Sequence, residues 1–566
     1  MRRYLKECVL GPLFKLLEAT LELLVPLVVA AIVDYGIVTA DVAYTTRMAI
    51  LLLIFGLVGL GFSVTAQYFA ARAAVGTVTT LRHDLLSHIL TLSHSEIDRI
   101  GTSTMLTRMT SDINLLQNGI NLALRLLLRS PFVVFGAMAV AFTIDVRSAL
   151  IFLGLIFVLA IVVFGIMLLT IPLHKRVGTM LERVTLRTRE NLTGVRPLRA
   201  FCKEKDECDE FRAESNTLAA EQTFVGRISA LLNPLTFVLV NLGILVLLHT
   251  GAVSVDGGAL TQGEVIALYN LMGQILVELI KLANLIITIT KAIASMHRID
   301  AVFEIKSSQD DPTECPTPVS GADAVTFRSV GLTYGGAGDA SLSGISFSVP
   351  KGATVGIIGG TGSGKSSLVS LLLRHYDATE GEVLIEGVDI RKYPRAQLVG
   401  RIAYVPQRAA LFSGTLRDNL TWRDKDASDG EMARALEIAQ AKGFTDEKGG
   451  LQAPVAQGGK NFSGGQRQRL TVARALVGDF DILVLDDATS ALDYATDAAL
   501  RRALAESFPD ATKFIVSQRA SALLDADLIL TLEDGELVGA GTHKELLDSC
   551  AVYREIYESQ LYREEA

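Results

Sequence analysis

The sequence predicts an all-α membrane domain of six helices with long cytoplasmic extensions, followed by a C-terminal α/β domain built around a phosphate-binding loop. Half of the 566 residues are hydrophobic and the mean hydropathy is +0.38, which is high for a soluble chain. The apolar residues concentrate before residue 305, and the remainder has the composition of a soluble domain. A polar, proline-containing stretch separates the two parts. We therefore expect a transmembrane domain at 1–304, a linker at 305–322 and a second domain at 323–566.

The first part contains six apolar segments, each close to the ~20 residues that a membrane-spanning helix needs. The loops after the third and fifth segments are short and almost free of Lys and Arg, whereas those after the second and fourth are long and basic. The positive-inside rule makes the basic loops cytoplasmic, so both termini also lie inside. We expect a multi-pass protein of the plasma or inner membrane, with spans at about 12–37, 48–76, 120–144, 147–172, 229–252 and 262–288.

The helical pattern of the two long loops continues beyond the apolar spans into the cytoplasm. This pattern predicts pairs of protruding helices that turn at a tip, with tips at 94–100 and 199–204. The soluble domain of the same chain needs a docking place, and these tips are the candidates. The alternative is a pair of solvated helical hairpins that bind nothing.

Several polar side chains fall inside the predicted spans, where a charged residue at mid-bilayer costs about 2.5–3.5 kcal/mol. They should therefore face a wet cavity or pair with one another. Arg125, Arg129 and Lys281 fit a cavity role and a structural role equally well, the structural role being ion pairs or side chains that reach the inner interface. The predicted substrate cavity, with an inner-leaflet bias and both signs of charge, is lined by Glu18, Glu22, Gln274 and Glu278.

Charge and cysteine content exclude some classes of function. The formal net charge of −8 argues against nucleic acid as a partner. The cysteines are scattered without metal-ligand spacing, and no histidine constellation suggests a metal site. Unpaired, reduced thiols are expected at Cys8, Cys202, Cys208, Cys315 and Cys550.

A phosphate-binding loop of the form G-x-x-x-x-G-K-[ST] follows the apolar strand 353–358 and precedes a helical run. Its glycines let backbone N–H groups surround phosphates, Lys365 supplies charge to the β- and γ-phosphates, and the Ser366 hydroxyl can bind Mg²⁺. Asp486, at the end of the apolar run 482–485, supplies an acidic partner for the Mg²⁺ shell. The candidate nucleotide-binding residues are Gly359, Gly360, Thr361, Gly362, Ser363, Gly364, Lys365, Ser366 and Ser367.

Further motifs give the chain a family resemblance. Ser463, Gly464, Gly465 and Gln466 open a predicted helix and resemble the signature motif of ABC ATPases, and 490–493 resembles the D-loop. Together with six spans and two cytoplasmic tips, they make the chain resemble a half-transporter of the ABC exporter family over nearly its whole length. The resemblance implies ATP with Mg²⁺. It also implies a Q-loop role on Mg²⁺ for Gln407 and adenine stacking for Tyr334.

Two positions depart from that family's pattern. Asp487 stands where the family usually has the Glu that polarises the attacking water, and Gln518 stands where it usually has a His at the γ-phosphate. Asp is one methylene shorter, about 1.5 Å of reach, and misplacing a catalytic group by ~1 Å can cost on the order of 10²-fold. Gln donates a hydrogen bond but cannot carry a proton. The substitutions therefore keep binding groups and weaken catalytic ones.

In the family such domains work as head-to-tail pairs, with each ATP held between one chain's loop and the other chain's signature motif. We expect this chain to bind ATP at a degenerate, slow P-loop site and to lend its signature motif to a second, different half-transporter. The expected assembly is a heterodimeric exporter of drugs, lipids or peptides. Three alternatives remain: Asp487 suffices with water filling the gap, the fold imports a siderophore-like substrate, or ATP gates a regulatory membrane protein.

Overall fold

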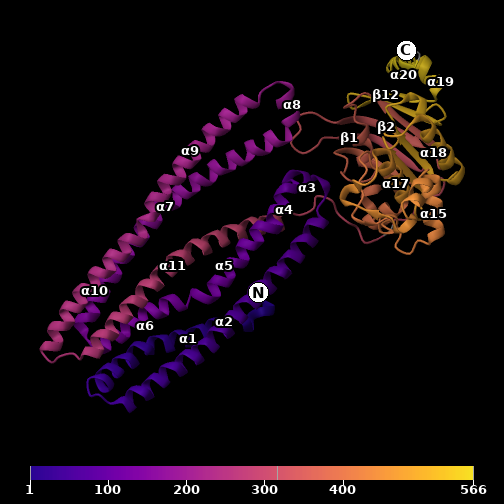
Figure 1. The fold of residues 1–566 in the computed structure, drawn as a ribbon. Coiled ribbons are helices and arrows are strands. Elements are labelled where there is room, and N and C mark those ends of the chain that lie inside the picture. The colour runs from indigo at the N-terminus through magenta and orange to yellow at the C-terminus, as the bar shows by residue number, and fades with distance from the viewer. Residues whose placement is uncertain (1, 315, 565–566) are drawn as a thin grey trace. The chain divides into compact units, whose positions relative to one another are not determined.

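The computed structural model describes residues 2–314 and 316–564, drawn in Figure 1. The described chain forms two compact units. One comprises Met1–Leu90 and Ser103–Glu304, and the other comprises Thr91–Thr102 and Ile305–Ala566. The short segment Thr91–Thr102 therefore belongs with the C-terminal unit although it lies between membrane helices in the sequence.

Six helical stretches of the described chain are long and apolar enough to cross a membrane, which confirms the fold class predicted for the first part. They are Leu5–Ile37, Val42–Thr91, Thr102–Ile144, Val146–Thr193, Glu204–Asp256 and Gln262–Phe303. Their constituent helices, after the opening turn η1 (Arg2–Tyr4), are α1 (Leu5–Ala31), η2 (Ile32–Ile37), α2 (Val42–Thr91), α4 (Thr102–Thr107), η3 (Arg108–Asp112), α5 (Ile113–Leu126), α6 (Arg129–Ile144), α7 (Val146–Thr193), α9 (Glu204–Ala230), α10 (Leu232–Asp256) and α11 (Gln262–Phe303).

Polar caps set several of these helix ends. The Asp145 carboxylate accepts a hydrogen bond from the Ser148 backbone N–H at 2.8 Å and so begins α7. Thr261 and Glu264 form a capping box that begins α11. Asp34, in the π-helical end of the first span, accepts hydrogen bonds from Thr261 Oγ1 at 2.6 Å and from Gly263 N–H at 2.8 Å. The first and last spans are therefore tied together at this end.

The helices of the first unit run as long neighbouring pairs, with α9 alongside α7 and α5 alongside α11 (Figure 1). Small residues allow close packing between them, and Ala19, Ala137, Ala141 and Ala149 are completely buried. The large apolar side chains on the outward faces stay exposed, as expected for surfaces that meet lipid.

The two predicted tips differ from each other and partly from expectation. The first is α3 (His94–Ile100), which matches the predicted range. The second is α8 (Val195–Ala200), so the predicted range 199–204 covers only its end, the following turn and the start of α9. Gly194 ends α7 and is followed by α8, while the turn itself is made at Cys202, a non-glycine residue with φ +52°.

Helix α3 packs on the C-terminal unit through polar and aromatic groups. The His94 ring stacks on the His375 ring with centroids 4.3 Å apart, and the Tyr376 hydroxyl donates a hydrogen bond to Asp98. The first predicted tip therefore has a docking partner in the same chain.

The C-terminal unit contains a six-stranded sheet of order β12-β11-β3-β10-β9-β6, in which only β12 is antiparallel to its neighbour. A four-stranded antiparallel sheet, of order β2-β1-β4-β5, and the short pair β7-β8 complete it. The strands are β1 (Val325–Leu332), β2 (Leu342–Val349), β3 (Thr354–Gly359), β4 (Glu380–Ile385), β5 (Val388–Asp389), β6 (Ile402–Val405), β7 (Gly414–Thr415), β8 (Pro454–Val455), β9 (Ile482–Asp486), β10 (Thr512–Val516), β11 (Leu528–Glu533) and β12 (Glu536–Gly541).

Helices cover these sheets and enclose two apolar cores, one around β1, β3 and β4 and one around β6, β9 and the helices that follow them. Parallel strands place their carboxyl ends on one edge, so the segments after β3, β6, β9 and β10 meet there. The helices are α12 (Lys365–Leu372), η4 (Ile390–Lys392), α13 (Arg395–Arg401), α14 (Leu416–Leu420), α15 (Asp429–Ile438), α16 (Lys442–Glu447), η5 (Gly450–Gln452), η6 (Gln457–Gly459), α17 (Gly464–Ala475), α18 (Tyr494–Ser507), η7 (Ala520–Ala522), α19 (His543–Ser549) and α20 (Ala551–Glu564).

Candidate functional site

The glycine-rich loop joins the end of β3 to the start of α12. A Cβ atom at Gly359 would lie 2.2 Å from the Leu532 carbonyl oxygen, so no larger residue fits there. Gly364 is the N-cap of α12 with φ +98°, a conformation that favours glycine. The first N–H groups of α12 have no acceptor within the helix, as at any helix start. The loop therefore presents backbone donors where an anion can approach, which fits a phosphate chain.

Lys365 lies folded over this loop. Its Nζ donates hydrogen bonds to the Gly359 carbonyl at 3.0 Å, to the Gly360 carbonyl at 2.6 Å and to Ser363 Oγ at 3.3 Å. Burial lowers the pKa of Lys365, and the neighbouring carboxylates Asp487 and Asp486 oppose that shift. The ammonium group thus sits beside both acids and the loop, where it can exchange its carbonyl contacts for phosphate oxygens.

Two adjacent acids end β9 on the same edge. Asp486 is buried, and the Tyr404 hydroxyl donates to its Oδ2 at 3.4 Å. Asp487 follows with φ +47°, a left-handed conformation that Asp tolerates better than most residues. Burial raises the pKa of both carboxyl groups, and for Asp486 the nearby charge of Asp487 adds to the rise. A divalent cation at this edge would relieve that repulsion.

The Asp487 side chain is held by two glutamines. Gln407 Nε2, from the segment after β6, and Gln518 Nε2, from the segment after β10, each donate to the same Asp487 oxygen at 3.3 Å. Gln407, Asp487 and Gln518, which the sequence singled out for roles on Mg²⁺ and in catalysis, therefore meet in one hydrogen-bonded group. Both partners of the acid are amides, and neither can take up or return a proton.

Tyr334 lies beside the helix that follows the glycine-rich loop. Its hydroxyl donates to Ser367 Oγ at 3.1 Å, and its ring meets the Tyr376 ring edge-on at 4.9 Å. This position next to α12 suits the predicted contact with a nucleobase. Tyr376 was not singled out by sequence, and its hydrogen bond to Asp98 links this aromatic pair to α3.

The signature-like motif forms a regular helix start. Ser463 is the N-cap of α17, its Oγ accepts from Gln466 N–H at 3.3 Å, and Gln466 Oε1 accepts from Ser463 N–H at 3.1 Å. Ser463 and Gly464 are exposed. Among the described residues, no hydrogen bond joins this motif to the glycine-rich loop. The motif is therefore a capped, exposed helix start of the kind that favours an anion.

In the membrane unit the structure joins polar residues from three spans. Arg129 forms ion pairs with Glu22, at 2.5 Å, and with Glu278. Glu278 is buried and also accepts hydrogen bonds from Ser130 Oγ at 2.7 Å and from Lys281 Nζ at 2.8 Å. We call Glu22, Arg129, Glu278 and Lys281 the charge cluster. Arg129 and Lys281 therefore form structural ion pairs, one of the alternatives predicted for them.

A cavity of about 410 Å³ lies beside the charge cluster, between α1 and α11. Glu22, Asn270, Gln274 and Glu278 line it together with apolar side chains such as Val25. Gln274 Nε2 donates to the Glu22 carbonyl at 3.3 Å, while its buried Oε1 has no hydrogen-bond partner. Glu18 lies outside this lining, and its carboxylate pairs with Lys15 at 2.5 Å.

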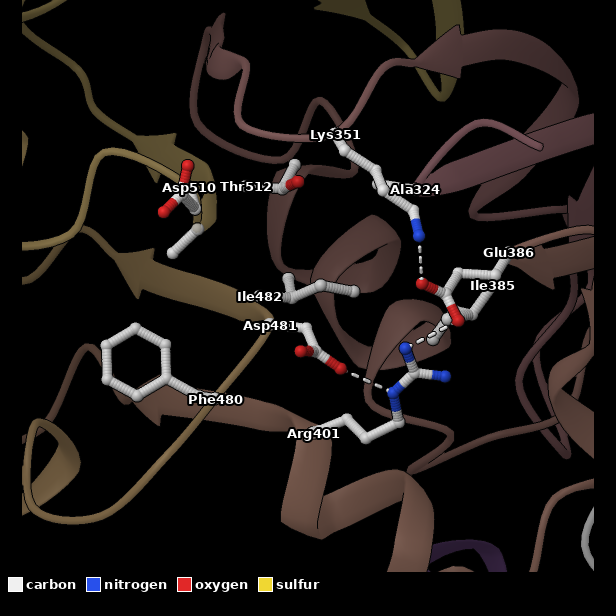
Figure 2. A pocket seen from close by; sticks show the side chains of 11 residues that line it. Ala324, Lys351, Ile385, Glu386, Arg401, Phe480, Asp481, Ile482, Asp510 and Thr512 are labelled. Carbon is white, nitrogen blue, oxygen red and sulfur yellow. Dashed lines mark hydrogen bonds and ion pairs between the residues drawn. The ribbon is translucent and has the colours of Figure 1, made fainter. Parts of the chain in front are cut away.

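A second pocket of about 170 Å³ in the C-terminal unit has a structural explanation (Figure 2). It lies at the amino-terminal ends of β9 and β10, on the edge opposite the glycine-rich loop. Glu386 bridges Lys351 at 2.5 Å and Arg401 at 2.6 Å, and Arg401 also pairs with Asp481 at 2.6 Å. These charges pair with one another, so we interpret the pocket as a structural ion-pair network and not as a ligand site.

Four of the five cysteines lie in the described part of the chain. Cys8, Cys202, Cys208 and Cys550 are free thiols, and Cys315 lies outside the described residues. Within the described part of the chain, no group of three or more His, Cys, Asp or Glu side chains could hold a metal ion. The hydrogen bond from Ser130 to Glu278 could not be predicted from sequence, because a serine in an apolar helix carries no pattern of its own.

Fold and sites together define a membrane-embedded ATPase, and comparison with known families agrees. Residues 8–279 match the ABC transporter transmembrane region, and residues 342–490 match the ABC transporter ATPase family. The chain belongs to the ABC transporter family. It is a half-transporter of the exporter type, with transmembrane and ATPase domains in one chain, and a multi-pass protein of the plasma membrane.

Individual relatives and a solved structure extend this picture. The chain is 35% identical to an uncharacterized ABC transporter ATP-binding protein of Mycobacterium tuberculosis, over 99% of this chain and 97% of the relative. It is 32% identical to a probable multidrug resistance ABC transporter of Bacillus subtilis (85% and 82% covered) and 30% identical to an ATP-dependent lipid A-core flippase of Desulfotalea psychrophila (86% and 85%). A bacterial Atm1-family ABC exporter with ATP bound has the same fold, with TM-score 0.82, 22% identity, and 99% and 98% covered.

Proposed function

We propose that this chain is one subunit of a heterodimeric ATP-driven exporter. Its own P-loop site binds ATP and hydrolyses it slowly, and its signature motif completes the competent site of a second, different half-transporter. One observation carries the proposal: Asp487, the acid at the position where the family usually has its catalytic Glu, is held by the amides of Gln407 and Gln518. Neither amide can relay a proton, whereas both can hold a nucleotide-bound water or phosphate in place.

The groups that bind nucleotide are all present. Lys365 supplies positive charge to the phosphates, and Ser366, Gln407 and Asp486 supply the oxygen ligands that Mg²⁺ prefers. Bound ATP brings the phosphoanhydride bond whose cleavage drives transport. Tyr334 offers an aromatic face to adenine, and the glycine-rich loop offers its backbone N–H groups. We therefore expect this site to bind ATP tightly and to hydrolyse it slowly.

The test restores both catalytic groups. We expect the double variant Asp487→Glu with Gln518→His to raise hydrolysis at this chain's P-loop site roughly tenfold or more, because a general-base arrangement typically contributes 10²–10⁴-fold. Hydrolysis is measured in single turnovers with the purified chain in lipid nanodiscs. The double variant Asp446→Glu with Gln397→His, at exposed positions of the same domain, is the matched control. Unchanged turnover in the restored variant would contradict the proposal.

A second experiment addresses the partner. The chain is purified alone and with the half-transporter encoded beside it, and ATP hydrolysis is compared. We expect low activity alone and a large increase on assembly, since only the mixed pair contains one consensus site. Full exporter-like rates from this chain alone would show that Asp487 suffices and that no different partner is needed.

We propose that the transported substrate is amphipathic and reaches the cavity beside the charge cluster. Supporting this, the cavity combines the unpartnered amide oxygen of Gln274 and the ion-paired carboxylates of Glu22 and Glu278 with valine and proline walls. We expect Gln274→Ala to weaken substrate-stimulated ATP hydrolysis several-fold, because Gln274 offers the unpartnered acceptor, and Gln222→Ala on exposed α9 to leave it unchanged. In inverted vesicles the cytoplasmic face of the membrane is exposed to added ATP. Uptake of substrate that depends on this ATP would support both export and cytoplasmic termini, whereas an importer would release substrate from the vesicles.

A further inference from the structure

The last helix of the chain is firmly attached to the ATPase domain. Tyr553 of α20 is completely buried, and its hydroxyl shares a hydrogen bond with His543 Nδ1 at 2.7 Å. Ile556 and Tyr557 pack against the apolar core that contains β9. The next turn of the helix is therefore held at a fixed place, and Gln560 is on it.

Gln560 pins the segment that follows β10 at two points. Its Oε1 accepts a hydrogen bond from Ala520 N–H at 2.8 Å, and its Nε2 donates to the Gln518 carbonyl at 2.8 Å. A side-chain amide thus pairs with the backbone across residues 518–520 as a neighbouring peptide would. Both bonds have good length, and Gln560 is half-buried, which limits competition from water.

The pinned segment serves two places in the nucleotide machinery. Gln518 Nε2 donates to Asp487 at 3.3 Å. Arg519 donates to the Leu492 and Ser490 carbonyls at 3.4 Å, in the stretch that resembles the D-loop. The Arg519 guanidinium also lies over the Tyr494 ring, 4.9 Å from its centre. A shift of residues 518–520 would therefore move both the amide at Asp487 and the support of the D-loop.

We propose that Gln560 is a positioning residue for ATP hydrolysis. It acts from the C-terminal helix through the backbone of residues 518–520, and so sets where the Gln518 amide meets Asp487. Gln560 itself touches neither nucleotide nor metal in this role. The inference concerns the ATPase reaction of the family and stands whether or not the P-loop site is slow.

The first test replaces Gln560→Met, which keeps side-chain length and removes both hydrogen bonds. We expect kcat for ATP at this chain's own P-loop site, measured with the chain purified alone, to fall about three- to tenfold, the range that losing one or two hydrogen bonds allows, while KM stays unchanged because the phosphate loop is untouched. Gln560→Glu retains the acceptor for Ala520 but sets an oxygen against the Gln518 carbonyl, and is expected to be at least as impaired. Glu558→Gln, exposed on the same helix, is the control.

Two further readouts separate positioning from a general loss of stability. Hydrogen exchange should accelerate at residues 518–522 in Gln560→Met, with the rest of the domain unchanged. In a Gln518→Ala background, Gln560→Met should lower kcat no further, because the side chain it positions is gone. The proposal is overturned if kcat is unchanged in Gln560→Met, if the exchange increase spreads over the domain, or if the effect persists in full without the Gln518 side chain.

Discussion

The two ATP-facing parts of this domain, the start of α17 and the edge formed by the glycine-rich loop and β9, differ in what they retain. At α17 the Ser463–Gln466 motif is unaltered, capped and exposed. At the other edge the binding groups are present, but Asp487 and Gln518 stand where the family has a longer acid and a titrating ring. The contrast teaches that holding a nucleotide and cleaving it are separable demands, placed on different side chains of one fold.

The largest expected effect comes from disabling the start of α17. We expect Gly464→Asp to lower ATP hydrolysis of the assembled transporter on the order of 10²-fold, because it puts a negative charge at a helix start that should face phosphate. A Cβ at Gly464 meets nothing within 4 Å, so folding is not the cause. Gly443→Asp, an equally open glycine in α16, is the control. If Gly464→Asp retained activity, the start of α17 would not be needed for hydrolysis, and its contrast with the glycine-rich loop would fail.

Removing the loop's charge should mainly weaken binding. We expect Lys365→Met to reduce affinity for a fluorescent ATP analogue roughly 10- to 100-fold, since hydrogen bonds to charged groups contribute about 1.5–3 kcal/mol. Hydrolysis at the partner's site should fall by a smaller factor. Lys392→Met, exposed on the same domain, should change neither quantity. If hydrolysis disappears while binding persists, then this site, too, is a hydrolysing one.

The stability of the C-terminal unit should depend on pH through His375, which stacks on His94 of α3. Burial, together with the neighbouring His94 and Arg395, lowers the pKa of His375 from 6.5 to about 4. Between these values the unfolded chain binds more protons, so stability falls as pH falls from about 6.5 towards 4. We expect a loss on the order of 1–2 kcal/mol by pH 5.

The single tryptophan, Trp422, lies in this domain, so its fluorescence follows unfolding of the domain alone. In His375→Gln the difference between the melting temperatures measured at pH 7.5 and at pH 5 should be smaller than in the unaltered chain. Asp98 and Tyr376 also face this contact, and Asp98→Asn serves as the comparison because it removes a carboxylate and leaves the imidazole pair. An unchanged pH dependence in His375→Gln would assign the effect to other groups.

The smallest expected effect is the sharpest test of the comparison. We expect Asp487→Asn to change ATP hydrolysis of the assembled transporter by threefold or less, because in the proposed heterodimer the hydrolysing site uses the partner's acid. A change of that size corresponds to well under 1 kcal/mol. The corresponding Glu→Gln change at the catalytic Glu of the proposed partner should abolish most activity. Equal losses at the two positions would mean that both sites hydrolyse.

Much of this architecture was readable from sequence because its signals are local. The six spans, α3 and the glycine-rich loop follow from apolar runs, helical periodicity and glycine spacing. The second tip was placed about four residues late, because its turn at Cys202 adopts a positive φ without glycine. Gly194 was the usable signal.

Contacts between distant segments could not be predicted in the same way. Periodicity put Glu22, Arg129 and Glu278 inside the bilayer, but it could not say that one guanidinium joins both acids. Gln560 has no sequence signal at all, since its role depends on α20 returning to the segment after β10. Such pairings are decided by tertiary packing, which one sequence does not display.

The charge cluster has an electrical consequence. Two carboxylates and two cations meet inside the membrane unit, so the group as a whole is neutral. Moving one elementary charge through the membrane potential is worth about 2.3 kcal/mol per 100 mV. A neutral group that moves as one body does no such work. Movement of this cluster should therefore add no voltage dependence to a rearrangement of these helices.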